Sequence, residues 1–327
     1  MTVKLLYFGD PHFGGNNPRS RTDDYKEATK AKIREIFQLA KDHQVNAIIE
    51  PGDTWDRPDT SISVLLEFAD LLAESPVPIY TTAGNHDLFS YNLETYWRTS
   101  LHLLERLVPQ FHVINDPAQP VYFGRHDDVQ VTFTPYTGKM DRDGYGYSPE
   151  NNNDHSYKIH VSHGMLLDHN PTHFDRYTYI GDVQTTANLV LTGHDHMGYG
   201  IYRRSDGVTF ANIGSLTRLS ASAGEIERPI QVLLFTWESP FEHVKLEEIP
   251  LKCARPGNEV LDRSKIEAEQ ERQYHMEQFS ALIQTTNGER VLLDVDQIVE
   301  TIAQQEGLPP GVAKLALEKI AEMRSMS

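Results

Sequence analysis

Residues 77–87 read VPIYTTAGNHD, in which a run rich in β-branched residues, 77–82, is followed almost at once by the motif Gly84-Asn85-His86-Asp87. An apolar run of this length bounded by a glycine is typical of a buried strand. The motif would then stand at the carboxyl end of the strand, where open α/β sheets place their binding sites because neighbouring loops meet there. The sequence predicts an α/β fold with a polar site at this edge.

Other polar motifs follow apolar runs in the same way along the chain. The runs are 3–8, 45–49, 159–161 and 189–191, and the motifs after them are Asp10-Pro11-His12, Gly52-Asp53, His163-Gly164 and Gly193-His194-Asp195-His196. Each motif alone is weak evidence, since Gly and Asp are ordinary turn formers. Their shared position at strand ends indicates one common site.

The residue types in these motifs are those that a pair of divalent cations requires. Two cations held about 3.5–4 Å apart need a carboxylate that bridges them, with His, Asp or Asn ligands around each. We expect Asp53 to be the bridge. One cation would be completed by Asp10, His12 and His196, and the other by Asn85, His163 and His194.

Carboxylates combined with neutral imidazoles favour transition metals over calcium or magnesium alone. We expect two Mn²⁺ ions, with magnesium, iron or zinc as the alternatives. Such a pair would activate water for attack on phosphorus and neutralise charge on the phosphoryl oxygens. His86 is left over from ligation, and an imidazole suits protonation of a leaving alkoxide near neutral pH. We therefore assign His86 as the general acid.

The remaining histidines are individually more typical of surface or packed positions than of ligands. His160 is the closest competitor, because it lies only three residues before His163. His160 falls inside the predicted strand 159–161, whereas His163 stands at the strand end before Gly164. We therefore prefer His163 as the ligand.

Together the motifs resemble those of the calcineurin-like metallophosphoesterases and, within that family, those of the SbcD nucleases. The stretch Gly52-Asp53-Thr54-Trp55-Asp56-Arg57 is similar to the family's Gly-Asp-x-Phe-Asp, with Trp in place of Phe. Asn212-Ile213-Gly214-Ser215, after the run 208–211, resembles the Asn-Pro-Gly-Ser turn that closes the phosphoesterase domain, with Ile in place of Pro. The resemblance covers roughly residues 1–250.

The resemblance implies a four-layer α/β sandwich, two mixed β-sheets flanked by helices, over residues 1–250, and a small helical appendage over residues 251–327. It also implies a metal-dependent DNA nuclease, an exonuclease or endonuclease, in DNA repair, recombination or end processing. The family works with an SMC-like coiled-coil ATPase, the SbcC-like subunit. The family's capping domain is missing or reduced here.

The tail is predicted to hold helices at 264–284, 295–305 and 310–324, the last two with a shared apolar face. In SbcD-like proteins a short helical segment after the catalytic region docks on the coiled-coil root of the ATPase. This tail has a suitable size and position, so we expect it to dock in that way. The alternative is that its apolar face packs on the chain's own core.

The charge of the chain argues against an unaided DNA-binding surface. Lys and Arg number 30 against 47 Asp and Glu, a net charge of −17, whereas DNA-binding domains are usually basic. Duplex affinity would then come from a partner or a homodimer, with Arg19, Arg21 and Lys26 as candidate phosphate contacts at the rim.

Two other classes of function stay open. A phosphodiesterase or phosphatase for small phosphoesters, such as cyclic nucleotides, would use the same site and would suit the acidic surface better. A metal-binding scaffold is the third class, but it would have no need of two complete ligand sets and His86.

The remaining features set the context. Helices are expected at 24–42, 62–74 and 97–107, and a long polar loop, a rim or lid, at 138–155. We expect a cytoplasmic protein without membrane contact, because no secretory signal or membrane-length apolar run is present and the single Cys253 fits a reducing compartment. The chain has no Gly-x-x-x-x-Gly-Lys-Ser/Thr loop for ATP hydrolysis.

Overall fold

A computed structural model describes residues 2–150, 156–171, 176–238 and 243–264, together with Arg272, Gly311, Val312, Lys314, Leu315, Leu317 and Lys319. The chain forms two compact units, residues 1–263 and residues 264–327. Within the predicted tail helices 264–284 and 310–324 the few described residues are helical, and the predicted helix 295–305 lies outside the described residues.

The first sheet has the strand order β14-β13-β1-β2-β3-β4. Its strands are β1 (Thr2–Tyr7), β2 (Ala47–Ile49), β3 (Ile79–Thr81), β4 (Phe111–Val113), β13 (Gln231–Glu238) and β14 (His243–Pro250). Strands β1 to β4 are parallel, whereas β13 runs antiparallel to both β1 and β14. Three of the predicted motifs therefore follow neighbouring parallel strands, β1, β2 and β3.

The second sheet has the order β11-β12-β10-β7-β6-β5. Its strands are β5 (Val121–Phe123), β6 (Val129–Thr134), β7 (Tyr157–His163), β10 (Leu189–Gly193), β11 (Gly200–Arg203) and β12 (Thr209–Asn212). The four inner strands are parallel, and each edge strand pairs antiparallel with its neighbour. The other two motifs follow β7 and β10, which are adjacent. A separate parallel pair consists of β8 (Leu166–Leu167) and β9 (Thr178–Tyr179).

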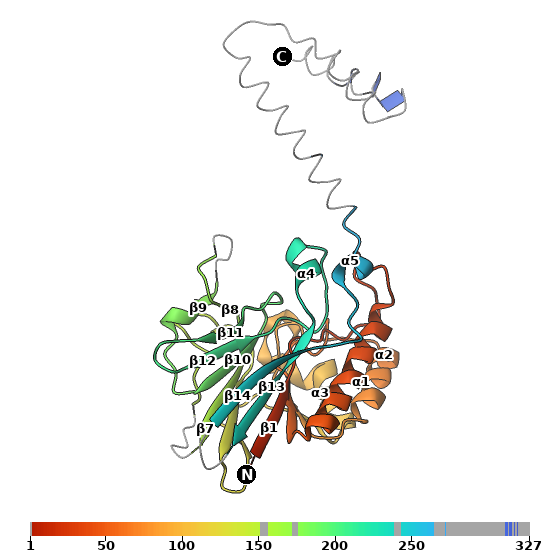
Figure 1. Ribbon diagram of the computed structural model, residues 1–327. Helices are drawn as coiled ribbons and strands as arrows, with labels where there is room; N and C mark the ends of the chain where they lie inside the picture. Colours follow the sequence, from red (N-terminus) through yellow and green to blue (C-terminus); the bar gives the residue numbers. More distant parts are fainter. Residues whose placement is uncertain are drawn as a thin grey trace, which may run out of the picture. The chain divides into compact units, whose positions relative to one another are not determined.

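Three helices cover the outer face of the first sheet (Figure 1). They are α1 (Tyr25–His43), α2 (Ile62–Leu72) and α3 (Ser100–Leu107). Helix α1 begins at Asp24, whose side chain accepts a hydrogen bond from the backbone of Glu27, and α3 begins at Thr99, which caps His102 in the same way. The predicted helix 97–107 was therefore wrong at its start, because Trp97 belongs to a separate 3₁₀ turn, η2 (Leu93–Arg98).

Alternate residues of the strands divide between two cores. Leu5 and Tyr7 of β1 face Val131 and Phe133 of β6 in the layer between the sheets, while Leu6 points to the helices. Side chains alternate because successive residues of a strand project from opposite faces. The fold is the predicted α/β sandwich of two mixed sheets flanked by helices.

The predicted polar loop is anchored over most of its described length. Met140 and Tyr147 are completely buried and pack with Val190 and Phe210 on the outer face of the second sheet. The 3₁₀ turn η3 (Ile180–Asp182) covers the same face. Residues 138–150 are thus anchored to the sheet by these buried side chains, while Lys139, Arg142 and Asp143 are exposed, and residues 151–155 of the predicted loop lie outside the described residues.

The first unit continues past residue 250. Val260 of α5 (Gly257–Val260) and Leu261 are buried against Ala221 and against Ile226 of α4 (Ala223–Glu227). With this small cluster the first unit extends to residue 263, and the second unit begins at residue 264. Among the described helices, none is long and apolar enough to cross a membrane.

Candidate metal centre

The loop after β1 is held in place by the turn at residues 212–215. A Cβ atom on Gly9 would lie 2.4 Å from the carbonyl oxygen of Gly214, so the two backbones meet at a distance that only glycine allows. The Ser215 hydroxyl donates to the Asp10 carbonyl at 2.8 Å. The turn that resembles the domain-closing Asn-Pro-Gly-Ser therefore supports the first predicted ligand directly.

Three predicted ligands have a left-handed backbone. The φ angles are 45° at His12, 51° at Asp53 and 78° at His194. This region costs a non-glycine residue about 1 kcal/mol or more, and it is retained where a functional geometry requires it. The sharp bends turn these side chains away from their strands and toward one another.

Asp53 lies at the centre of the site and is completely buried. Its Oδ1 accepts a hydrogen bond of 2.7 Å from the backbone N–H of His86. Its Oδ2 lies 3.3 Å from Nε2 of His163 and 3.7 Å from Nε2 of His12. One carboxylate oxygen is therefore fixed by the protein, while the other faces imidazoles from both sheets.

Asp87 organises the backbone around Asp53. Its carboxylate accepts hydrogen bonds from the backbone N–H groups of Thr54, Trp55 and Gly84, at 3.3, 2.9 and 2.9 Å. The loops after β2 and β3 are thereby tied together. Sequence reasoning gave Asp87 no role, although it stands in the same short motif as Asn85 and His86.

His163 is oriented by the loop after β2. Its Nδ1 lies 3.0 Å from the carbonyl oxygen of Pro51, and because a carbonyl can only accept, Nδ1 carries a proton. Nε2 lies 3.0 Å from Oδ1 of Asn85. Burial acts to lower the pKa of His163, but the Asp53 carboxylate outweighs it and raises that pKa to about 9, so a bound cation would displace the proton on Nε2. A Cβ on Gly52 would come within 2.8 Å of the His163 ring, which explains the glycine there.

The motif after β10 brings in two more imidazoles. The backbone N–H of His194 donates to Oδ2 of Asp10 at 2.7 Å, and the His194 and His163 rings lie 5.1 Å apart. Nε2 of His196 lies 2.9 Å from Nε2 of His12 and 3.7 Å from Oδ2 of Asp10. His194 thus lies on the His163 side of the centre and His196 on the Asp10 side.

The seven predicted ligands come together as two groups that share one residue. The ligand atoms of each group lie within 4.8 Å of one another, in the sets Asp10, His12, Asp53, His196 and Asp53, His163, His194. Asn85 joins the second group through its contact with His163. Asp53 is the shared carboxylate, which is the arrangement that a bridged pair of cations needs.

Two buried oxygens test whether cations fit here. Oδ1 of Asp10 and Oδ2 of Asp53 are inaccessible and have no hydrogen-bond partner among the described residues. An unpaired buried carboxylate oxygen is costly unless a positive charge compensates for it. Cβ atoms on Gly193 and Gly84 would lie 2.2 Å from carboxylate oxygens of Asp10 and Asp53, respectively. The donor set and the close backbone fit two divalent cations.

Burial and mutual proximity shift the ionisation of these groups. Burial would raise the pKa of Asp53, but the imidazoles of His163 and His12 hold it well below its usual range. Burial lowers the pKa of His194 to about 3 and that of His196 to about 4. Both rings are therefore neutral at pH 7 and can offer a nitrogen lone pair to a cation.

His86 stands at the edge of the ligand groups. Its Nδ1 lies 3.0 Å from the carbonyl oxygen of Asp56, and its ring packs edge-on against His12 at 4.9 Å. Burial acts to lower the pKa of His86, but the Asp53 carboxylate outweighs it and the pKa is raised. A partly accessible imidazole whose pKa is raised from its usual value suits the predicted general acid.

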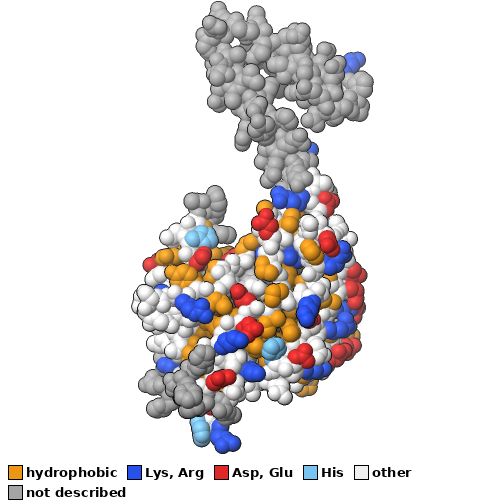
Figure 2. Space-filling model, in the orientation of Figure 1, with side chains coloured by type: hydrophobic (Ala, Val, Ile, Leu, Met, Phe, Trp, Pro, Cys, Tyr) orange, Lys and Arg blue, Asp and Glu red, His pale blue; other side chains and the backbone are white. Residues whose placement is uncertain are grey.

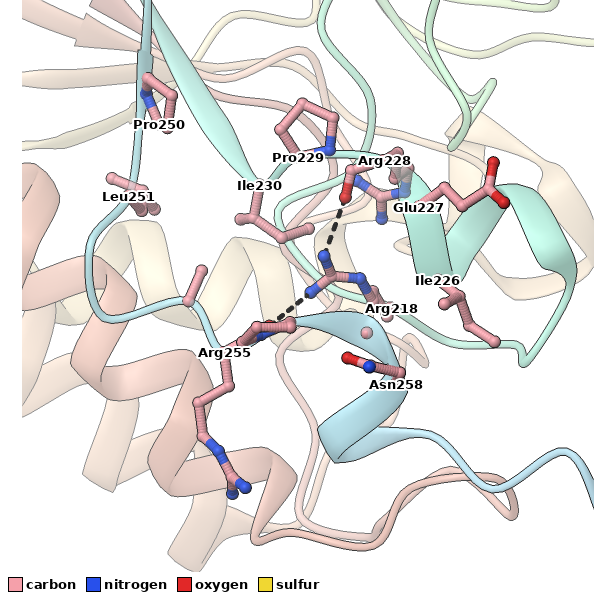
Figure 3. Close-up of a pocket in the computed structure, with 13 residues that line it drawn as sticks. Arg218, Ile226, Glu227, Arg228, Pro229, Ile230, Pro250, Leu251, Arg255 and Asn258 are labelled. Atoms are coloured by element: carbon pink, nitrogen blue, oxygen red, sulfur yellow. Dashed lines mark hydrogen bonds between the residues drawn. The ribbon is translucent and has the colours of Figure 1, made fainter.

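A buried guanidinium network supports the turn at 212–215 from behind. Arg228 donates to the carbonyl oxygens of Ser215 and Thr217 at 2.7 and 2.6 Å and pairs with Glu225 at 3.0 Å. Arg218 donates to the carbonyl oxygens of Arg228 and Arg255 on the wall of a cavity of about 430 Å³ (Figure 3). No local motif marks these arginines, so sequence reasoning missed them.

Some sequence expectations fall outside the centre. His160 is buried in β7, where its ring nitrogens contact the Thr132 hydroxyl and the Gly146 carbonyl, so it is not near the ligand groups. The predicted phosphate contacts stay a prediction, although Arg21 is buried against Asp23 and Lys26 pairs with Glu67. Neighbouring acidic side chains therefore pair with both of these basic residues. Arg19 is exposed.

The chain matches a known protein family in sequence. The sequence model of the calcineurin-like phosphoesterases matches residues 3–198, and no curated protein sequence matches the chain. Similar solved structures include a putative 5′-nucleotidase from Staphylococcus aureus, with 15% identity, a TM-score of 0.47 and coverage of 81% of this chain and 55% of that one.

Two further structures are similar to the chain. A dimetal phosphatase from Danio rerio has 12% identity, a TM-score of 0.47 and coverage of 76% of this chain and 96% of that one. Purple acid phosphatase from yellow lupin (Lupinus luteus) seeds has 13% identity, a TM-score of 0.49 and coverage of 80% and 53%. The chain thus spans about half the length of the nucleotidase and purple acid phosphatase chains.

Proposed function

Because the chain belongs to the calcineurin-like phosphoesterase family and is a metallophosphoesterase, we propose that it is a metal-dependent nuclease that hydrolyses phosphodiester bonds of DNA. The observation that carries the hydrolytic part is the position of Asp53 in both ligand groups. The DNA part rests on the stretch 52–57 and the turn 212–215, which resemble SbcD nucleases.

The residues divide the chemical work between them. Two divalent cations, Mn²⁺ by preference, would be held by the two groups that share Asp53, and when bound they supply the Lewis acidity that activates water and neutralises phosphoryl charge. Asp87 and Arg228 fix the loops that present the ligands. His86 holds a proton at the rim, where it can be given to the leaving oxygen.

The surface supports a nuclease that depends on a partner. On the face drawn in Figure 2, basic and acidic side chains of the described residues are interspersed. With a net charge of −17, affinity for a polyanion would have to come from elsewhere. We propose that an SMC-like coiled-coil ATPase, or a second copy of the chain, supplies it.

The tail is the proposed docking segment for this ATPase. Within the predicted helix 310–324, Val312 and Leu315 are helical, and they are 48% and 61% exposed. An exposed apolar pair on a helix is what a partner helix could cover.

The nuclease proposal is tested with the purified chain and Mn²⁺ on linear duplex DNA, single-stranded DNA and cyclic nucleotides. We expect degradation of DNA that weakens steeply as salt rises, because each phosphate contact releases counterions. The Asp53→Asn variant controls for contaminating nucleases. Hydrolysis of cyclic nucleotides with no cleavage of either DNA at any salt concentration would contradict the proposal.

That contrary outcome defines the second candidate, a phosphodiesterase or phosphatase for small phosphoesters. The acidic surface favours it, because a small substrate contacts only the centre and needs no basic track. The same ligand groups and His86 would serve.

A further inference from the structure

The segment just after the motif Gly84-Asn85-His86-Asp87 contains an exposed aromatic residue with a strained backbone. Ser90 and Tyr91 both have a left-handed backbone, with φ angles of 51° and 58°. A bulky residue such as Tyr91 in this region is a genuine outlier. Despite this cost, the Tyr91 side chain is 59% exposed, so it gains little from burial.

The strain is built into a well-anchored turn. Leu88 is buried at the start of the segment. The backbone N–H of Phe89 donates to the Thr95 hydroxyl at 3.1 Å, and that hydroxyl donates to the Asn92 carbonyl at 2.7 Å. These bonds fix the backbone of the turn on both sides of Tyr91. Strain of this kind clusters at sites that bind ligands.

A row of rings connects Tyr91 to the metal centre. The Tyr91 ring packs against Tyr136 with 6.2 Å between centroids. The Tyr136 ring in turn lies 5.8 Å from the ring of His194 and 6.3 Å from that of His163. The backbone N–H of Tyr136 donates to the Ala83 carbonyl at 2.8 Å. This bond fixes Tyr136 beside the motif at residues 84–87. The row therefore begins at two ligands and ends at the exposed tyrosine.

We propose that Tyr91, supported by Tyr136, is a stacking platform for the nucleobase next to the scissile phosphate. This rests on the proposed function, since it names the part of a nucleic acid strand that the rim recognises. A base is joined to its phosphate through one sugar, so a phosphate at the centre places its base at the rim. Stacking on an aromatic face tolerates any base and requires no net positive charge, which suits an acidic protein.

Two diesters with the same leaving group test the platform. Thymidine 5′-(p-nitrophenyl phosphate) carries a base, and methyl p-nitrophenyl phosphate does not. We expect the wild type to prefer the nucleoside diester in kcat/KM by about 5- to 150-fold, the range for stacking of one base. Tyr91→Ala should remove most of this preference and leave hydrolysis of the methyl diester unchanged. Tyr91→Phe should keep the preference, because stacking needs the ring and not the hydroxyl.

A matched control is Tyr122→Ala, which removes another partly exposed tyrosine, 37% exposed on the edge strand β5. It should leave the preference intact. A wild type without preference would overturn the platform, as would a Tyr91→Ala variant that loses activity equally on both diesters. A wild type that prefers the nucleoside diester but cannot cleave DNA would overturn the nuclease proposal alone.

A binding measurement gives a second reading. The fluorescence of a 2-aminopurine oligonucleotide falls when the base stacks on an aromatic ring. We expect quenching with the wild type and with Tyr91→Phe, and its loss with Tyr91→Ala. Quenching that persists in Tyr91→Ala would place the base elsewhere and overturn the assignment.

Discussion

The Asp10 carboxylate accepts a hydrogen bond of 2.7 Å from the backbone N–H of His194, a residue 184 positions further along the chain. This bond joins the carboxyl end of β1 in the first sheet to that of β10 in the second. The candidate centre therefore exists only when the two sheets are packed against each other. Its ligands depend on the core between them as much as on their own loops.

Asp53→Asn should damage both cation sites at once. The amide keeps the shape but removes the negative charge that the two groups share. Loss of a residue that merely supports a metal ligand typically costs about 10- to 100-fold in metal affinity or activity. Because Asp53 is itself the shared ligand, we expect larger losses of both, measured by metal analysis of the purified variant and by rate. Asp59→Asn, at an exposed carboxylate with 51% side-chain accessibility, is the control and should change neither. Two retained ions with full turnover would show that the bridge lies elsewhere.

His86→Ala should slow the reaction without removing the cations. Loss of a general acid costs roughly 10²–10⁴ in rate when the leaving group is an alkoxide. A p-nitrophenolate leaving group needs little protonation, so its hydrolysis should suffer much less. His169→Ala, at an exposed imidazole, should have no effect on either substrate. Equal losses on both substrates would indicate that His86 positions the substrate instead.

Arg228→Ala should destabilise the first unit. The change leaves the Glu225 carboxylate buried without its partner, at 5% side-chain accessibility, and removes the donors that hold Ser215 and Thr217. Breaking a buried pair in this way costs about 3–5 kcal/mol in the free energy of unfolding. Arg57→Ala removes an exposed pair and should cost less than about 1 kcal/mol.

Chemical denaturation measures both arginine variants. Replacing the whole pair, with Arg228→Met and Glu225→Gln together, should cost less than Arg228→Ala, because no lone charge is then buried. A double variant that is less stable than the single variant would contradict this account.

His160 should make stability depend on pH. Burial lowers the pKa of His160 to about 4, while the unfolded chain has a pKa near 6.5. The unfolded state therefore binds more protons between these values. Stability is complete above about pH 6.5 and falls by roughly 3 kcal/mol as pH decreases to about 4. His160→Gln should show a shallower fall in the same window. If the free energy of unfolding fell equally with pH in the wild type and in His160→Gln, His160 would not be the source of the pH dependence.

Removal of residues 264–327 distinguishes a docking tail from a packed one. The first unit ends at residue 263, and α5 closes on its own small cluster. We expect the truncated protein to keep its melting temperature and its Mn²⁺-dependent hydrolysis of small diesters, while binding to the proposed coiled-coil ATPase is lost. Calorimetry and co-purification measure the two properties. A large drop in melting temperature with ATPase binding intact would contradict docking.

Local sequence was sufficient for the strands that precede the motifs and for the choice of candidate ligands. The strand before Gly84 depends on residues within a few positions of each other, so its run of β-branched residues and the glycine that bounds it reveal it. The start of α3 was missed because Trp97 has ordinary helix propensity. What excludes it is the Thr99 cap, which begins a new helix two residues later.

Only the tertiary structure decided how distant residues meet. Asp53 contacts imidazoles of both sheets, Arg228 reaches the turn beside Asp10, and Tyr91 lies in a row of rings that ends at His194. These contacts depend on how the sheets and loops pack, and no local pattern carries that information. The sequence by itself determined which chemical groups stand at the strand ends. Close packing of the two sheets determined that those groups share one buried carboxylate.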